Sequence, residues 1–376
     1  MPLARWRRIL LRFVQVVTCA AGLALVAIAV CVICCRTTPL LFKPTPEPLR
    51  HPTQAAGIKD YARPEVDTFY TYPEWYIVWS YQAKADFQRN HLPSGYSWFG
   101  DIAQFWHGYC SVYSYTRSLY PFPVGDHIML VVIGSSFSLE YTLKGLYEET
   151  IGRLSEWSSH HEPVAEDAYA AQVAESYAAF VHVRPFYEYS FAHALHGLWA
   201  GTPFRSGHLL RTLERRAWLT LDYSVEAVYC QLIELGTHAT YGFEDTTTAA
   251  WIQFPPEVRA PLVSLVPSLK FVRELGPGEA MVELTRYQQF TPDARNLMEA
   301  GVRFHQIAGN QLIVFSAIAP AGWTTAVPNL QLLLAQPMLT DRSKTRAVFL
   351  CPVSELHIPL PLLERQGLRI EHIYDY

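Results

Sequence analysis

The chain has 376 residues, enough for two or three compact domains. Half of the residues are hydrophobic and only 17% are charged, a composition that excludes a disordered protein. The formal net charge is −4 at pH 7, and the few clustered arginines lie in residues 1–12. The acidic remainder excludes nucleic acid as a partner, because that partner needs clustered lysine and arginine.

The N-terminal 35 residues have the pattern of a membrane anchor. Residues 1–12 contain four arginines and no acid, and the 23 residues of 13–35 contain no charged side chain. A helix of that length spans roughly 34 Å, against about 30 Å of hydrocarbon in a bilayer. A cleaved signal peptide has a shorter apolar stretch followed by a small-residue cleavage site, and this sequence has neither. We therefore expect a single transmembrane helix over 13–35.

The arginines predict the orientation of this helix. The positive-inside rule places residues 1–12, a basic tail, in the cytoplasm. The protein is then expected in the inner (cytoplasmic) membrane with its body in the periplasm or another extracytoplasmic space, and the lipid bilayer is its first expected partner. A second span over 128–147 is the alternative, but Glu140 and Lys144 interrupt it, and the uncharged part has the length of a buried core helix.

The rest of the chain divides into three segments. Residues 36–68 contain six prolines, which predicts an extended tether that lifts the body off the membrane. Residues 69–254 are expected to be mainly helical, with helices near 127–157, 165–184 and 206–236.

Residues 265–376 have a different character. β-rich runs flank Gly276-Pro277-Gly278 and again Gly309-Asn310, which predicts two hairpins. Helices are expected after Thr291-Pro292 and before Gly367. The pattern predicts a small α+β sandwich domain with helices on one face of a sheet. The fold class is therefore α+β: an N-terminal transmembrane helix, a helical domain, then this domain.

The most distinctive motif is an aromatic stretch around Pro73. Thr71-Tyr72-Pro73-Glu74 has the pattern of a capping box at the start of a helix, with Pro73 in the first turn. The alternative is a binding site in which Glu74 seats a cationic ligand among aromatic faces. The candidate binding residues of this stretch are Tyr72, Glu74, Trp75 and Tyr76.

A ladder of charges forms the second set of candidates. Glu140, Lys144 and Glu148 are four residues apart, so a helix presents them on one face. Three interpretations remain open: a solvated helix face, a paired internal network, or a buried ion-pair site or docking face for a partner.

Other reactive residue types show no recognisable pattern. His193 and His196 have a spacing that can hold a metal, but no carboxylate or thiol accompanies them at a known spacing. The three cysteines outside the apolar segment are far apart and predict no disulfide framework. Cys110 near His107 is a conceivable pair, although sequence adjacency does not make a dyad. We expect no catalytic residue, metal or cofactor.

Three segments carry a resemblance. Tyr72-Pro73-Glu74-Trp75-Tyr76-Ile77-Val78, Lys144-Gly145-Leu146-Tyr147-Glu148-Glu149-Thr150-Ile151-Gly152-Arg153 and Ile307-Ala308-Gly309-Asn310 resemble segments of a group of uncharacterised bacterial membrane-anchored proteins with a Tyr-Pro-Glu-Trp motif. The likeness covers most of residues 65–320. It implies a bacterial source and an anchored envelope protein, and no activity comes with it.

These observations predict a single-pass protein of the cell envelope with a binding or scaffolding role. A membrane or periplasmic protein is the expected partner, because exposed tyrosine and tryptophan side chains supply anchor residues for such contacts. The alternative is an enzyme of unknown class with its site between the helical and α+β domains.

Overall fold

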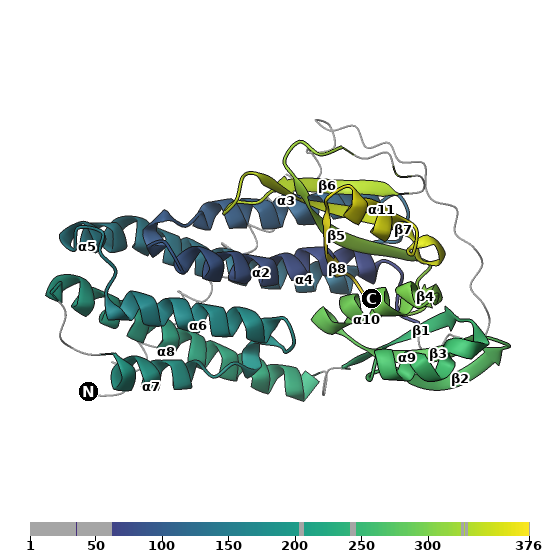
Figure 1. Cartoon of the computed structure of the whole chain (residues 1–376). Coiled ribbons are helices and arrows are strands. Elements are labelled where there is room, and N and C mark those ends of the chain that lie inside the picture. The colour runs from purple at the N-terminus through teal and green to yellow at the C-terminus, as the bar shows by residue number, and fades with distance from the viewer. Residues whose placement is uncertain are drawn as a thin grey trace, which may run out of the picture.

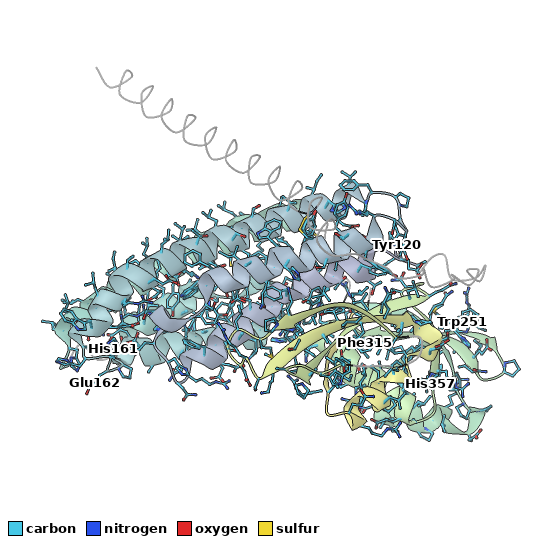
Figure 2. All side chains as sticks on the ribbon, turned by 90° about the horizontal axis from the view of Figure 1, so that it is seen from above. Tyr120, His161, Glu162, Trp251, Phe315 and His357 are labelled. Carbon is cyan, nitrogen blue, oxygen red and sulfur yellow. A yellow bond between two sulfur atoms is a disulfide. The ribbon has the colours of Figure 1, made fainter. Side chains whose placement is uncertain are left out.

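The computed structural model describes residues 35, 62–202, 207–240, 246–324, 327 and 330–375. The fold is α+β: a helical bundle stands beside two four-stranded antiparallel sheets (Figure 1). Figure 2 shows the far tip of the bundle at His161 and Glu162, with the sheets at the other end around Trp251 and His357. The predicted transmembrane helix and tether lie outside the described residues, apart from Cys35 and residues 62–68.

In the described residues, the bundle is built from one short helix and six long ones, and each of the long helices contributes aromatic side chains to the core. They are α2 (Asp67–Gln88), α3 (Trp98–Thr116), α4 (Val124–Tyr147), α5 (Arg153–Ser158), α6 (Ala165–Val181), α7 (Phe191–Gly201) and α8 (Leu209–Thr240). A π-helical turn, Glu148–Gly152, joins α4 to α5. These elements confirm the helices predicted near 127–157, 165–184 and 206–236.

The predicted capping box at Thr71 is wrong. Helix α2 begins at Asp67, and the Thr71 hydroxyl donates a hydrogen bond of 2.8 Å to the Asp67 carbonyl one turn earlier. Pro73 therefore lies inside the helix instead of in its first turn. Phe69 and Tyr70 are buried, so tertiary packing extends the helix upstream of the local capping signal.

The two sheets share one connectivity. Sheet A has the order β2-β3-β1-β4 and sheet B the order β6-β7-β5-β8, so each places its first strand third and its fourth strand at the edge. The strands are β1 (Thr247–Gln253), β2 (Lys270–Gly276), β3 (Glu279–Thr285), β4 (Arg303–Ile307), β5 (Leu312–Pro320), β6 (Gln331–Pro337), β7 (Lys344–Pro352) and β8 (Arg369–Ile373). A helix precedes the last strand of each sheet: α10 (Phe290–Glu299) in one and α11 (Pro359–Arg365) in the other.

The sheets confirm part of the predicted α+β pattern and correct the rest. The hairpin at Gly276-Pro277-Gly278 joins β2 to β3, with Gly278 at φ +74°. The second predicted hairpin is wrong, because β4 and β5 belong to different sheets and only one bridge, Ile307 with Asn310, spans the turn. Strand β1 lies in the segment expected to be mainly helical, where its alternating burial marks it as a strand.

Three buried cores lie within the described residues. One fills the space around both sheets with α10, α11 and the short helix α9 (Arg259–Leu265). A second, largely aromatic core lies within the helical bundle. The third joins α2, α3 and the N-terminal part of α4 to the other face of sheet B, through residues such as Tyr72, Val314 and Leu350. The bundle and the sheets therefore share a continuous packed interface along α2.

Candidate functional site

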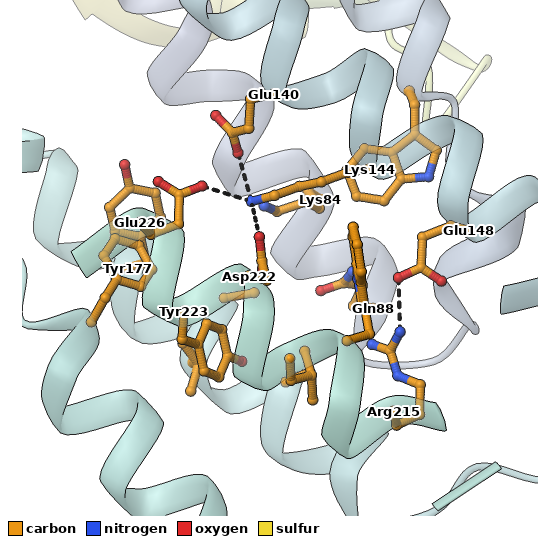
Figure 3. Close-up of a pocket in the computed structure, with 17 residues that line it drawn as sticks. Lys84, Gln88, Glu140, Lys144, Glu148, Tyr177, Arg215, Asp222, Tyr223 and Glu226 are labelled. Atoms are coloured by element: carbon orange, nitrogen blue, oxygen red, sulfur yellow. Dashed lines mark hydrogen bonds and ion pairs between the residues drawn. The ribbon is translucent and has the colours of Figure 1, made fainter. Parts of the chain in front are cut away.

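A buried cluster of charges lies between α4 and α8. The Lys144 ammonium contacts three carboxylates, at 2.8 Å from Glu140, 3.1 Å from Asp222 and 3.0 Å from Glu226 (Figure 3). The Lys144 side chain is only 13% exposed. The Tyr81 hydroxyl donates to the second oxygen of Glu140 at 2.8 Å. Of the three interpretations of the charge ladder, the internal network is the one that the structure contains.

The network continues through the π-helical turn. Glu148 is buried there and accepts a hydrogen bond of 2.8 Å from Arg215 of α8. Arg215 also lies 2.9 Å from Asp167 of α6. Arg211, one turn earlier on α8, donates to the same Asp167 carboxylate at 2.8 Å. Three helices are thus tied together by charge-assisted contacts deep in the bundle.

The α8 partners of this network were not identified from the sequence. Arg211, Arg215, Asp222 and Glu226 recur at intervals of four and seven residues, which places them on one helix face. This spacing was a usable signal, because these charges are opposite in sign to those of the Glu140, Lys144 and Glu148 ladder and could pair with them. Nothing in the sequence showed that the two helices are neighbours.

The charge states follow from burial and from the pairs. Burial alone would lower the pKa of Lys144, but the carboxylates of Asp222, Glu140 and Glu226 outweigh it and hold that pKa well above its usual value. Burial raises the pKa of Glu148 against the opposing effect of Arg215. Lys144 therefore remains charged and acts as a fixed cation among the carboxylates.

A second lysine beside this cluster is held differently. Lys84 of α2 is buried, and its ammonium lies 5.1 Å from the ring centre of Tyr81 and 5.7 Å from that of Tyr141. No carboxylate of the described residues lies within ion-pair distance of it. Burial, and then the neighbouring Lys144 charge, lower the pKa of Lys84. The two lysines thus differ: Lys144 is neutralised by acids, and Lys84 is accommodated by aromatic faces.

The cluster lines a small cavity. Its volume is about 60 Å³, and Lys84, Glu140, Lys144 and Glu148 are among its lining residues. Such a volume holds a few water molecules, whereas pockets for metabolites are roughly 300–1,000 Å³. In this conformation the arrangement binds α2, α4 and α8 to each other and has no room for a metabolite-sized substrate.

The aromatic motif of α2 does not join this cluster. Glu74 is exposed and does not line the cavity. Tyr72 and Trp75 are buried against sheet B: the Tyr72 hydroxyl donates to Gln336 at 2.8 Å, and the Trp75 ring centre lies 3.8 Å from that of His372. The Tyr76 hydroxyl donates to Asp101 at 2.7 Å. Tyr72 and Trp75 thus hold the bundle to sheet B, and Tyr76 connects α2 to α3 within the bundle.

His372 is expected to make the stability of this interface depend on pH. Burial and the neighbouring His182 lower the pKa of His372 to about 3, so the folded protein holds it neutral. The unfolded chain binds a proton near pH 6.5, and stability is therefore lost as the pH falls below that value. Because of the proton that His372 binds only in the unfolded chain, we expect the free energy of unfolding to fall by about 2 kcal/mol between pH 7 and pH 5.

The measurement is chemical denaturation of the full chain in detergent at both pH values, with His372→Gln as the matched variant. The variant should show a smaller loss than the unmodified chain, because the glutamine does not titrate. Equal losses in the two proteins would mean that His372 does not carry this pH dependence.

A disulfide connects the N-terminal segment to the bundle, contrary to the expectation of no disulfide framework. Cys35 is bonded to Cys110 of α3, across 75 residues of sequence (Figure 2). The sequence interpretation missed it because Cys35 was assigned to the apolar segment. The bond also excludes Cys110 as a nucleophile paired with His107, whose ring instead lies 3.2 Å from the Gln336 amide.

The described part of the chain has neither a metal-ligand cluster nor a membrane-spanning helix. There, no three histidine, cysteine or acidic side chains are grouped as metal ligands, and His193 and His196 are exposed on α7. In the same residues, no helix has both the length and the apolar character needed to cross a bilayer, α4 and its 128–147 segment included. Helix α4 is not a buried core helix either, since several of its large apolar side chains are exposed.

Comparison with protein-family models, with curated proteins and with solved structures finds no match.

Proposed function

We propose that this chain is a membrane-anchored protein of the bacterial cell envelope, with a binding or scaffolding role. Residues 13–35 cross the inner membrane, residues 1–12 are cytoplasmic, and the body lies on the extracytoplasmic side. The observation that carries the proposal is the Cys35–Cys110 disulfide, which lies at the body end of the apolar segment.

The disulfide supports the orientation independently of the arginines. Disulfides form and persist in oxidising compartments such as the periplasm and are rare in the cytosol. The four arginines before residue 13 place the other end of the segment in the cytoplasm. The disulfide and the arginines therefore both favour a folded body on the extracytoplasmic side.

A binding or scaffolding role agrees with the pairing of the buried charged side chains inside the protein. Glu140, Lys144 and Glu148 are each paired with groups of the same chain, and the cavity beside them is small. The resemblance over residues 65–320 agrees with an anchored envelope protein.

The experiment detects the disulfide in cells. Whole cells are quenched with acid, free thiols are blocked, and the protein is treated with a maleimide polymer with or without prior reduction. In the unmodified chain, the reduced sample should carry two more labelled thiols than the unreduced sample. In a Cys110→Ala variant, this difference should disappear. A Cys230→Ala variant is the control, because that buried thiol is free. The same labelling with and without reduction would contradict an oxidised, extracytoplasmic body.

An enzyme that acts on a very small carbonyl compound is the second candidate. The observation that favours it is Lys84, which lines the cavity of about 60 Å³ and packs against the rings of Tyr81 and Tyr141. A buried lysine beside another cation has a depressed pKa and can act as a nucleophile toward a carbonyl group. The amine adds to the carbonyl carbon and water leaves, which gives an imine. We place this site inside the bundle, not between the helical and α+β domains.

Incubation with acetaldehyde and cyanoborohydride tests this second function. The borohydride reduces the imine to a stable secondary amine, which mass spectrometry locates. Selective modification of Lys84 over exposed Lys344 would favour the enzyme, and modification of exposed lysines alone would remove this candidate.

A further inference from the structure

Helix α4 has its polarity reversed relative to a water-facing helix. Its large exposed side chains are apolar and lie 42–62% open to solvent: Ile128, Met129, Val132, Leu139, Leu143 and Leu146. Its charged side chains Glu140 and Lys144 point inward to the buried cluster. A helix on the surface of a soluble protein has the opposite arrangement.

Helix α8 repeats this reversal. Apart from Gln231, its exposed large side chains are again apolar, at 45–71%: Leu209, Leu210, Leu213, Leu221, Val225, Val228, Leu232 and Leu235. Its arginines Arg211 and Arg215 are almost completely buried. No charged residue is exposed in α4 or in Leu209–Leu235 of α8.

The two apolar stripes form one surface, here called the α4–α8 face. The helices are joined side by side through Lys144 with Asp222, and the rings of Tyr147 and Trp218 stack at 3.6 Å. Both helices turn their inner sides into the same aromatic core, which includes Tyr141 and Tyr223. Their outer sides therefore face the same way. A contiguous apolar surface of this kind marks an interaction site.

The N-terminal segment indicates what covers this face. The apolar segment 13–35 ends at Cys35, and Cys35, Cys110 and Leu130 of α4 share one buried cluster. Leu130 lies within one turn of exposed Ile128 and Val132, at the start of the α4 stripe. If residues 13–35 cross the bilayer, the disulfide brings the membrane surface to the beginning of the α4–α8 face.

The far end of the face also has the character of a membrane contact. Beyond α4 the apolar side chains of Ile151, Leu154 and Trp157 are exposed, beside the exposed Arg153. Trp157, at 72%, is the most exposed large hydrophobic side chain of the described residues. Tryptophan is enriched where proteins meet the interfacial layer of a bilayer. A single helix about 10 Å wide would cover one stripe and not both.

We propose that the α4–α8 face rests on the bilayer in which residues 13–35 are anchored, with its leucine and valine side chains in the interfacial layer of the outer leaflet. The inference rests on the proposed function, because the anchor brings the face to the lipid. The body then lies along the membrane, and the proline-rich segment does not hold it away. Burial of apolar side chains in the interface, as for amphipathic helices lying on membranes, supplies the attraction.

The test uses a photoreactive amino acid in the full chain. p-Benzoylphenylalanine replaces Leu143 of α4 or Val225 of α8, and Gln172, which is exposed on α6, is the matched control position. The protein is reconstituted in vesicles of phosphatidylethanolamine and phosphatidylglycerol that contain a radiolabelled phospholipid, and is then irradiated. We expect at least tenfold more lipid adduct at Leu143 and Val225 than at Gln172.

Three other outcomes would overturn the proposal. An intrachain product with residues 13–35 would make the anchor itself the occupant. A crosslinked dimer would indicate a second copy of the chain. Lipid adducts equal to those at Gln172 would mean that the face is open to water. Retention of the Cys35–Cys110 bond in each variant, read from its mobility without reductant, checks that the substituted chains are folded.

Failure of this inference differs from failure of the proposed function. In the same vesicles, protease added from outside reports which chains have an outward body. If lipid adducts form but the body is found in the cytoplasm of cells, the lipid contact of the α4–α8 face is supported and the proposed orientation is wrong. If the body is oxidised and extracytoplasmic but no lipid adducts form, the proposed orientation is supported and the lipid contact of the α4–α8 face is wrong.

Discussion

Replacing Lys144 with methionine is expected to destabilise the folded body by about 3–5 kcal/mol. The substitution leaves Glu140, Asp222 and Glu226 without the cation that all three contact within 3.1 Å. Methionine fills a similar volume, so the loss comes from charge and not from a cavity. Chemical denaturation of the full chain in detergent, followed by tryptophan fluorescence, measures the free energy of unfolding.

Two comparisons identify the cause of that loss. Arg89→Met removes the ion pair between Arg89 and Glu175, two side chains that are about half exposed. This substitution should lower the free energy of unfolding by at most about 1 kcal/mol. In Lys144→Met, Glu140 and Glu226 lose the cation that lowers their pKa values, while burial and their mutual repulsion, which raise those values, remain. Lowering the pH therefore protonates these carboxylates and restores stability. The difference from the unmodified chain should therefore shrink between pH 8 and pH 5. A difference that does not change with pH would contradict the charge explanation.

Removal of the disulfide is the second large effect expected. Cys110→Ala opens a loop closed over 75 residues, and the chain-entropy model assigns such a loop about 4 kcal/mol. The bond stabilises mainly by restricting the unfolded chain. Denaturation under non-reducing conditions should show this loss, and prior reduction of the unmodified protein should produce a similar one.

Cys230→Ala is the matched control for the loss of sulfur volume, because Cys230 is buried and free. It should lower stability by about 1 kcal/mol, and its stability should not respond to reductant. If Cys110→Ala and Cys230→Ala behave alike, the Cys35–Cys110 bond does not contribute as described.

The sequence predicted where the helices lie along the chain better than which helices contact each other. Hydrophobic periodicity and the four-residue charge spacing located the helix that contains Glu140 and Lys144. Their partner Glu226 is 82 residues from Lys144, and no local pattern reports a contact across that distance. The same limit explains why a solvated face and an internal network could not be separated from the sequence.

Local signals were misleading where tertiary contacts overrode them. The capping pattern at Thr71 is real as a pattern, but burial of Phe69 and Tyr70 moved the helix start to Asp67. The turn at Gly309-Asn310 was recognised, although the strands beside it pair with different sheets. Cys35 was assigned to the apolar segment, and only the folded chain places it beside Cys110.

Labelling from outside the cell tests the central claim most directly. Single cysteines replace Arg7 in the basic tail and Gln172 on α6, and intact spheroplasts are treated with a membrane-impermeant maleimide. We predict that Gln172→Cys reacts in intact spheroplasts and that Arg7→Cys reacts only after lysis. Reaction of both positions only after lysis, or of Arg7→Cys alone before it, would contradict an anchored protein with its body outside the cytoplasm.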